Sequence, residues 1–122
     1  PGKPFWFGKK DKKTFFAFPG NPVSTYLSCI KYFYLWYRKS MGLPFIHETK
    51  AVLEADFEFN PALTYFLQVE VLNKEGVLYA KPLAGNGSGD LANLLECNAF
   101  LELPAERSSF KKGEAFPVLF YR

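Results

Sequence analysis

One change in the spacing of apolar residues limits what this chain can fold into. From Pro22 to Met41 apolar residues recur every three or four positions, which is typical of one face of a helix. Beyond Pro44 they alternate with polar residues, which is typical of half-buried β-strands. Gly42, two residues before that proline, can take the left-handed conformation that ends a helix. The sequence therefore predicts a mixed α and β fold, with a long helix over residues 22–41 followed by strands.

Charge changes at the same place as the apolar spacing. Residues 1–44 hold eight Lys and Arg against one acidic residue, so their net charge is +7. Residues 45–122 hold seven Lys and Arg against eleven acidic residues, so their net charge is −4. The whole chain has 122 residues, which is enough for one ordinary domain or two small ones. We therefore expect two domains, 1–44 and 45–122.

Two aromatic runs precede the helix. Residues 4–8 (PFWFG) and 14–18 (TFFAF) are short, apolar and bounded by Gly or Pro, a composition that favours buried strands. Residues 9–13 (KKDKK) are mostly lysines, and we expect them to form a solvated connection between the two strands. Phe, Tyr and Trp make up 19 % of the chain, which excludes a disordered or linker-like protein.

Residues 45–122 show the alternation of about five short strands, a number suited to a small, mainly antiparallel β-barrel. The first strand, within 45–59, is expected to be bent or interrupted. Residues 73–76 (NKEG) predict a hairpin turn, and residues 111–113 (KKG) predict another. The apolar positions that alternate with polar ones are Leu63, Tyr65, Leu67, Val69, Val71, Ala99, Leu101, Leu103, Phe116, Val118 and Phe120.

The residue inventory excludes several kinds of site. No apolar stretch reaches the roughly 18 residues of a membrane span, and no secretory signal is visible. Cys29 and Cys97 are too few for a disulfide framework or a thiolate metal site, and His47 has no second imidazole. We therefore expect a soluble cytoplasmic protein with both thiols reduced and buried. His47 is expected to be a surface histidine or one whose hydrogen bonds are satisfied, rather than a catalyst. Asp56 and Asp90 are expected to be isolated carboxylates, the former solvated.

The segment FPGNPVS, residues 18–24, leads directly into the long helix. Pro22 suits the first helical position, where a missing N–H costs nothing, and Asn21 before it is a favoured cap. Gly20 allows a ligand or another chain to approach the backbone closely. The positive end of the helix dipole makes this turn a candidate anion site. A strand followed by a capped helix is also common without any ligand, so a purely structural turn is the alternative.

Two further segments have a chemical and a structural interpretation. Residues 85–90 (GNGSGD) can form an array of backbone N–H donors, to which Ser88 adds a hydroxyl. They match neither a Walker loop nor the GxGxxG spacing, so the alternative is a flexible connection before a short helix. The basic, aromatic residues 1–10 have the composition of a nucleic-acid site. Their continuous apolar run favours burial instead, and no nucleic-acid partner is expected.

Three motifs together resemble a known family. PGKPFWFG, FPGNPVS and PLAGNGSGDLANLLECNAFLELP are similar, in this order, to the C-terminal part of the molybdopterin molybdenumtransferases, the bacterial MoeA type and the E domain of gephyrin. The resemblance implies insertion of molybdate into adenylylated molybdopterin with release of AMP, with Mg²⁺ and a homodimer. It implies that residues 1–44 are a strand-strand-helix piece of the α/β molybdopterin-binding domain, and that residues 45–122 are the small β-barrel C-terminal domain.

The resemblance also assigns site residues. Pro19 and Pro22 match prolines that line the family's molybdate site, and Ser88 matches a serine that faces it. Gly20 and Asn21 lie between the two prolines and are inferred to shape the same pocket. The expected residues for binding substrate and molybdate are therefore Pro19, Gly20, Asn21, Pro22 and Ser88, and Lys3 and Gly87 are further candidates for binding an anion.

The chain also departs from the family pattern. It begins with Pro1, after the acidic residues that bind the metal in the family, so we expect no catalytic residue and no metal ligand in it, and no activity from it alone. Asp90 stands where an apolar residue often follows the GSG triplet. The aromatic residues of 1–44 are expected to have packed against the absent part, leaving exposed apolar surface or a surface covered by a neighbouring chain. The alternative function is a protein-interaction scaffold of the gephyrin type.

Overall fold

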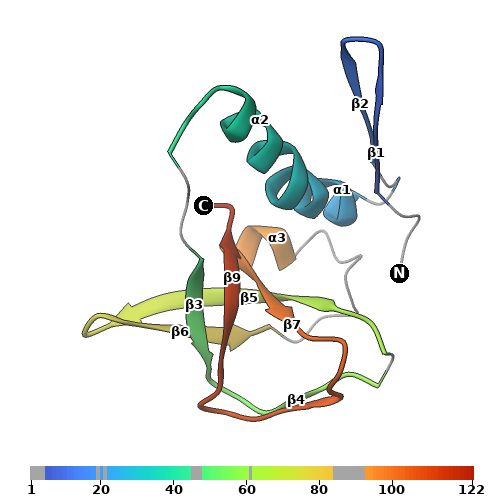
Figure 1. The fold of residues 1–122 in the computed structure, drawn as a ribbon. Helices are drawn as coiled ribbons and strands as arrows, with labels where there is room; N and C mark the ends of the chain where they lie inside the picture. The colour runs from blue at the N-terminus through green and yellow to red at the C-terminus, as the bar shows by residue number, and fades with distance from the viewer. Residues whose placement is uncertain (1–4, 19, 21, 45–47, 61, 84–92) are drawn as a thin grey trace. The chain divides into compact units, whose positions relative to one another are not determined.

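The computed structural model divides into two compact units, residues 1–46 and 47–122, each of which is described by itself. No helix among the residues it describes is long and apolar enough to cross a membrane. The described residues are 5–18, 20, 22–44, 48–60, 62–83 and 93–122 (Figure 1).

The first unit begins with a two-stranded antiparallel sheet. Strand β1 (Trp6–Lys10) pairs with β2 (Lys13–Ala17), and the register places Trp6 opposite Ala17. Asp11, with φ 57°, lies in the turn between the strands. The two strands are confirmed, but the solvated connection predicted over residues 9–13 is wrong in extent. Three of its lysines belong to the strands, because the hairpin closes with a turn of two residues.

The first unit does not bury these two strands, so the expectation of buried strands is wrong within the unit, whereas the expected exposed apolar surface on residues 1–44 is confirmed. Trp6 is 57 % exposed, and Phe7 and Phe15 are each 46 % exposed. Phe16 is half-buried, because its ring packs against Phe33 and Trp36 of the following helix at centroid distances of 5.2 and 5.1 Å. A two-stranded sheet has two faces, and within this unit helical side chains pack against Phe16 on one of them.

The predicted helix over 22–41 is confirmed to within one residue. It consists of α1 (Pro22–Ser28), a π-helical turn η1 (Cys29–Phe33) and α2 (Tyr34–Ser40), which follow one another without a break. The π-helical turn was not predicted, since apolar residues surround the helix there and hide the local change of period. Large apolar side chains remain exposed on this helix, as expected: Tyr26, Tyr32, Tyr34, Leu35, Tyr37 and Met41.

The helix ends at the predicted glycine. Gly42 has φ 68°, and its N–H donates to the carbonyl of Lys39 at 3.3 Å. The N–H of Leu43 donates to the carbonyl of Arg38 at 2.9 Å. This pair of bonds around a left-handed glycine is the Schellman motif, which satisfies carbonyls that the last helical turn leaves free.

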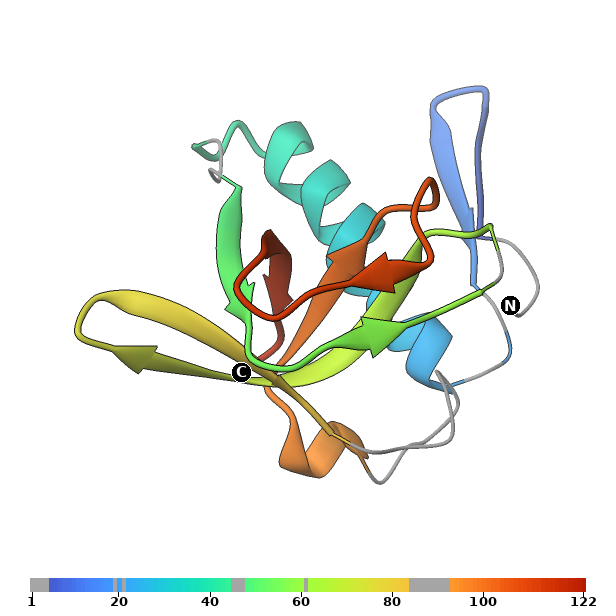
Figure 2. The same cartoon turned by 90° about the horizontal axis from the view of Figure 1, so that it is seen from below.

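The second unit is a closed five-stranded barrel with the strand order β3-β6-β5-β7-β9 (Figures 1 and 2). Among these pairings β3 and β6 are parallel and the others antiparallel, which confirms the predicted mainly antiparallel barrel. A short sheet joins β4 to β8, so the interrupted first strand is confirmed as β3 and β4. The bounds are β3 Thr49–Leu53, β4 Phe57–Glu58, β5 Tyr65–Lys74, β6 Val77–Pro82, α3 Asn93–Glu96, β7 Ala99–Leu103, β8 Ser109–Phe110 and β9 Ala115–Phe120.

The barrel interior follows the predicted alternation, with two exceptions. Leu63 precedes β5 and is 50 % exposed, and Phe120, the last residue of β9, is 40 % exposed. Tyr65 packs on the edge of the core. The buried core is Ala51, Leu53, Leu67, Val69, Val71, Ala80, Ala99, Leu101, Leu103, Phe110, Phe116 and Val118.

Both predicted turns of the barrel are confirmed. Glu75 and Gly76 have φ 54° and 86°, the two positive values of a type I′ hairpin turn between β5 and β6. Gly113 has φ 96° in the turn between β8 and β9. Asp56 is exposed as predicted but is not isolated, since its carboxylate accepts a hydrogen bond from the N–H of Lys112 at 2.8 Å. This carboxylate therefore fixes the second turn.

One side chain pairs with the barrel backbone as another strand would. Asn98 Oδ1 accepts from the N–H of Val71 at 2.7 Å, and its Nδ2 donates to the carbonyl of the same residue at 3.0 Å. The backbone N–H of Asn98 donates to Val69 at 3.2 Å, and its carbonyl accepts from Tyr121 at 3.0 Å. Asn98 therefore links β5 to the residues just after β9.

Candidate functional site

The candidate anion site lies between β2 and α1. The strand ends at Ala17, and α1 begins at Pro22, so the predicted position of this proline at the start of the helix is confirmed. Gly20 and Pro22 are both exposed. Pro19 and Asn21, predicted for the same site, lie outside the described residues.

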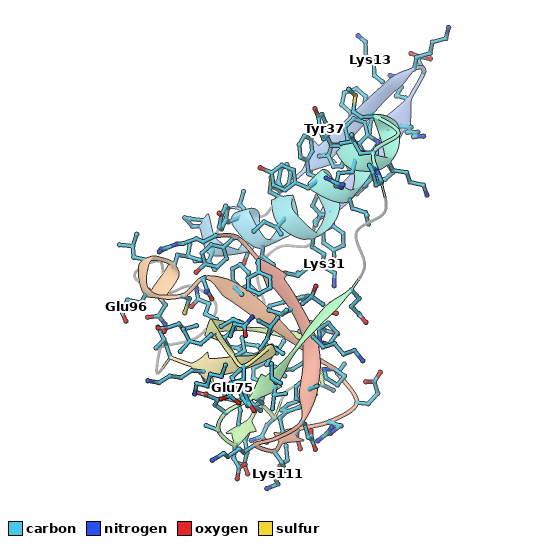
Figure 3. The ribbon with its side chains drawn as sticks, turned by 90° about the vertical axis from the view of Figure 1, so that its left-hand side faces the viewer. Lys13, Lys31, Tyr37, Glu75, Glu96 and Lys111 are labelled. Carbon is cyan, nitrogen blue, oxygen red and sulfur yellow. The ribbon has the colours of Figure 1, made fainter. Side chains whose placement is uncertain are left out.

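The start of this helix favours an anion electrostatically. Its first turn contains no acidic residue, so no carboxylate offsets the positive end of the dipole there. Seven Lys and Arg against one Asp occur among the described residues of the unit. The lysines of the hairpin are exposed, and Figure 3 shows Lys13 at its tip. The described part of the unit therefore carries a net positive charge, and the first turn of α1 adds no negative charge to it.

Gly20 is open on the side where a side chain would stand. A Cβ built there would meet no atom within 4 Å. Its φ is not in the left-handed region, so its backbone conformation does not require glycine. The described residues therefore give neither a packing nor a conformational reason for glycine at this position, whereas positive φ values favour glycine at Gly42 and Gly76.

The second predicted segment lies in the other unit. Gly87, Ser88 and Asp90 of the glycine-rich stretch are outside the described residues, as are Lys3 and His47. The expected short helix is present as α3, which contains Leu94 and Leu95. The turn before α1 and the glycine-rich segment thus belong to different units of the chain.

Sequence reasoning missed the side chains that hold α3. The hydroxyl of Tyr121 and the guanidinium of Arg122 both donate to the carbonyl of Leu94, at 3.0 and 2.6 Å. The N–H of Cys97 donates to the carbonyl of Asn93 at 2.8 Å. Nothing in the spacing of Tyr121 and Arg122 along the chain indicates contact with a helix 27 residues earlier.

Cys97 is not suited to nucleophilic chemistry. Burial, with smaller contributions from Glu70 and Glu96, raises the pKa of the Cys97 thiol to about 11, against the opposing effect of Arg122. The thiol is therefore protonated at neutral pH. Both cysteines are free. Cys97 is buried as predicted, but Cys29 is only half-buried, because it lies in the π-helical turn, none of whose residues is buried.

The described residues offer no metal centre. Within the described ranges no group of three or more His, Cys, Asp or Glu is placed to hold a metal ion. Arg107 pairs with Glu114 at 2.7 Å and lies over the ring of Phe110 at 5.3 Å. Lys74 pairs with Glu54 at 2.7 Å. These ion pairs join neighbouring strands and turns of the barrel and do not converge on a ligand position.

An open apolar groove lies in the first unit. The volume of the groove is about 680 Å³. Phe5 stacks on Tyr32 at a centroid distance of 4.7 Å on one side of it. Its lining residues are Phe5, Phe7, Phe16, Tyr32, Leu35, Trp36 and Lys39.

Comparison with known proteins gives a consistent family. Residues 50–121 match the family model of the MoeA C-terminal region, domain IV. Over 120 residues the chain is 38 % identical to a molybdopterin molybdenumtransferase from Synechocystis, covering 96 % of this chain and 28 % of that protein. It is 30 % identical over 132 residues to the Drosophila melanogaster molybdenum cofactor synthesis protein cinnamon, covering 100 % of this chain and 21 % of that protein.

A solved structure agrees with the sequence relatives. The crystal structure of the molybdopterin biosynthesis moeA protein from Pyrococcus horikoshii superposes with a TM-score of 0.72 at 25 % identity. The superposition covers 99 % of this chain and 30 % of that protein. The chain therefore spans less than a third of the length of these relatives.

Proposed function

The chain belongs to the family of the MoeA C-terminal region, and from this premise we propose that it serves in molybdenum cofactor synthesis as part of a molybdopterin molybdenumtransferase. The observation that carries the proposal is the 38 % identity to the Synechocystis transferase over 96 % of this chain. The reaction proposed is insertion of molybdate into adenylylated molybdopterin with release of AMP. Residues 1–44 supply the end of the molybdopterin-binding domain, and residues 45–122 supply the C-terminal barrel domain.

Molybdate and the substrate phosphates bind, in this proposal, at the turn before α1. Both are oxyanions, which a helix start attracts through its dipole. Pro22 begins that helix, the first turn holds no carboxylate, and Gly20 is open to an approaching ligand. Pro19 and Asn21, the sequence neighbours of Gly20, are proposed to bind the same ligands. The net positive charge of residues 1–44 raises the local concentration of an anionic substrate.

The glycine-rich segment holds the second set of residues that we propose to bind the oxyanions. Ser88 offers a hydroxyl donor to an oxyanion, and Gly87 permits close approach of the backbone. Lys3 is a further cation for the phosphates. No step is assigned to Mg²⁺ here, because the described residues contain no group of acidic, His or Cys side chains that fits it. The metal ligands, the homodimer and the cytoplasmic location remain predictions from the family resemblance.

The test is a chimera of the Synechocystis transferase in which residues 1–122 of this chain replace the matching segment. We expect the chimera to convert adenylylated molybdopterin and molybdate to active cofactor with release of AMP. The 122-residue chain alone is expected to produce none. An inactive chimera that is folded and binds molybdopterin would overturn the proposed function, and activity of the chain alone would overturn the proposal that it holds only part of the site.

A scaffold function is the second candidate, favoured by the exposed apolar side chains of residues 5–44. Exposed patches of this kind often mark protein-binding sites. An aromatic peptide should then bind the groove. Leu35→Glu should abolish this binding, and Ser88→Ala should leave its affinity unchanged. Equal binding to both variants and to the unsubstituted chain would remove this candidate.

A further inference from the structure

The β1–β2 hairpin has one face that does not pack on the helix. Opposed residues of an antiparallel pair share a face, and successive residues of a strand alternate between the two faces. Phe16 lies on the face that packs against the helix. The register places three pairs together on the other face, which we call the Trp6 face: Trp6 with Ala17, Gly8 with Phe15, and Lys10 with Lys13.

The indole of Trp6 lies over the backbone of Gly8. A Cβ built at Gly8 would lie 2.7 Å from Cζ2 of Trp6 and 3.1 Å from Cζ3, both of which belong to the six-membered ring. Any side chain at position 8 would therefore displace this ring. Trp6 is nevertheless 57 % exposed, so the glycine supports one part of the indole while another part faces solvent. Phe15, opposite Gly8, is 46 % exposed and extends the same aromatic surface.

Two lysines occupy the end of the Trp6 face that is next to the hairpin turn. Lys10 and Lys13 are opposed across the two strands, and both are exposed. Two residues of a strand span about 7 Å, so the backbone of Lys10 lies about that far from Gly8. The residues that the register places on this face include no carboxylate, since Asp11 lies in the turn beyond it. The Trp6 face therefore has an aromatic half and a cationic half.

We propose that the Trp6 face binds a free nucleoside monophosphate, with its base stacked on Trp6 and its phosphate between Lys10 and Lys13. The flat π surface of a base stacks on an exposed aromatic ring, and phosphate attracts the point charge of a lysine. One ribose joins the two groups, as one pair of strand residues joins the two halves of the face. An apolar peptide would use the aromatic half alone and leave both lysines without a counter-charge. This inference does not depend on the proposed function.

Titration of the 122-residue chain with AMP locates the ligand. The chain has two tryptophans, so its nitrogen–proton NMR spectrum contains two indole N–H signals. Trp6→Leu identifies the signal of Trp6 by removing it. AMP should shift the Trp6 signal and leave the signal of Trp36 unchanged, because the ring of Trp36 packs against Phe16 on the opposite face of the hairpin.

Calorimetric titration with AMP measures the contribution of each half. Trp6→Leu should weaken binding about tenfold, as expected for the loss of one stacked base, whereas Trp6→Phe keeps a ring and should lose much less. Gly8→Ala displaces the indole and should weaken binding as Trp6→Leu does. Lys10→Ala combined with Lys13→Ala should weaken binding about tenfold and reduce its dependence on salt. Lys112→Ala is the matched control, since it removes an exposed lysine of the barrel.

Two partial ligands test whether base and phosphate are both recognised. Adenosine lacks the phosphate and should bind the unsubstituted chain as weakly as AMP binds the double lysine variant. Ribose 5-phosphate lacks the base and should bind as weakly as AMP binds the Trp6→Leu variant.

Several results would overturn the proposal. These are absence of AMP binding, or equal affinity of AMP for the unsubstituted chain and the Trp6→Leu variant. A shift confined to Trp36 would place the ligand in the groove instead. Self-association that Trp6→Leu abolishes would place a second copy of the chain on the Trp6 face. None of these measurements involves molybdate or the chimera, so failure here would leave the proposed function standing.

Discussion

Replacing Asn98 with alanine should destabilise the barrel much more than the same change at an exposed asparagine. The side chain of Asn98 makes two hydrogen bonds with the backbone of Val71, at 2.7 and 3.0 Å. Val71 is 6 % exposed, so water cannot readily replace the lost partners. A net loss of about 1 kcal/mol for each bond, plus the cost of leaving a buried N–H and C=O unpaired, gives about 2–4 kcal/mol.

The matched control is Asn73→Ala. Asn73 is exposed, and its Oδ1 accepts one hydrogen bond, from the N–H of Gly76 at 2.9 Å. Loss of one exposed bond should cost less than about 1 kcal/mol. Urea unfolding followed by far-ultraviolet circular dichroism measures both free energies, with unchanged denaturant dependence as the sign that the unfolding reaction is the same. If Asn98→Ala costs no more than Asn73→Ala, the assignment of Asn98 as a substitute strand partner is wrong.

Three further predictions concern single residues. Gly76→Ala should lower the free energy of unfolding by about 1 kcal/mol, because the φ of Gly76 is 86°. Gly20→Ala should leave the free energy of unfolding unchanged and weaken only the molybdate dependence of the chimera. Equal free energies of unfolding for the two variants would contradict this prediction. Leu101→Ala should cost about 2–5 kcal/mol in urea unfolding, because Leu101 is 0 % exposed in the core. Between pH 9 and 11 the unfolded chain loses the Cys97 proton while the folded chain keeps it, so the free energy of unfolding should fall as pH rises, and Cys97→Ala should show a smaller fall.

The sequence indicated the barrel well because its signals are local. The alternation of Leu67, Val69 and Val71 directly indicates which side chains face the core. Positive φ values at Gly76 and Gly113 are required by the turns that join neighbouring strands, and glycine marks them. Such features are visible in any window of a few residues.

The rest depends on contacts distant in sequence. Apolar composition predicted burial for the β1–β2 hairpin, but exposure depends on what covers each face, which a run such as Trp6 and Phe7 cannot reveal. The bonds of Tyr121 and Arg122 to Leu94 join residues 27 and 28 positions apart. For the candidate site, the helix start at Pro22 was predictable from its cap and proline. The openness of Gly20 was not, because it is a property of the folded surroundings.

The most direct test of the proposed site is the molybdate dependence of cofactor formation by the Synechocystis chimera carrying Pro22→Ala or Ser88→Ala. If the turn before α1 and the glycine-rich segment bind molybdate, each substitution should raise the half-saturating molybdate concentration about tenfold, as expected for loss of one positioned contact. Arg107→Ala, which affects only the barrel, should leave it unchanged. Half-saturation that is the same in all four proteins would contradict the assignment of these two segments as the molybdate site.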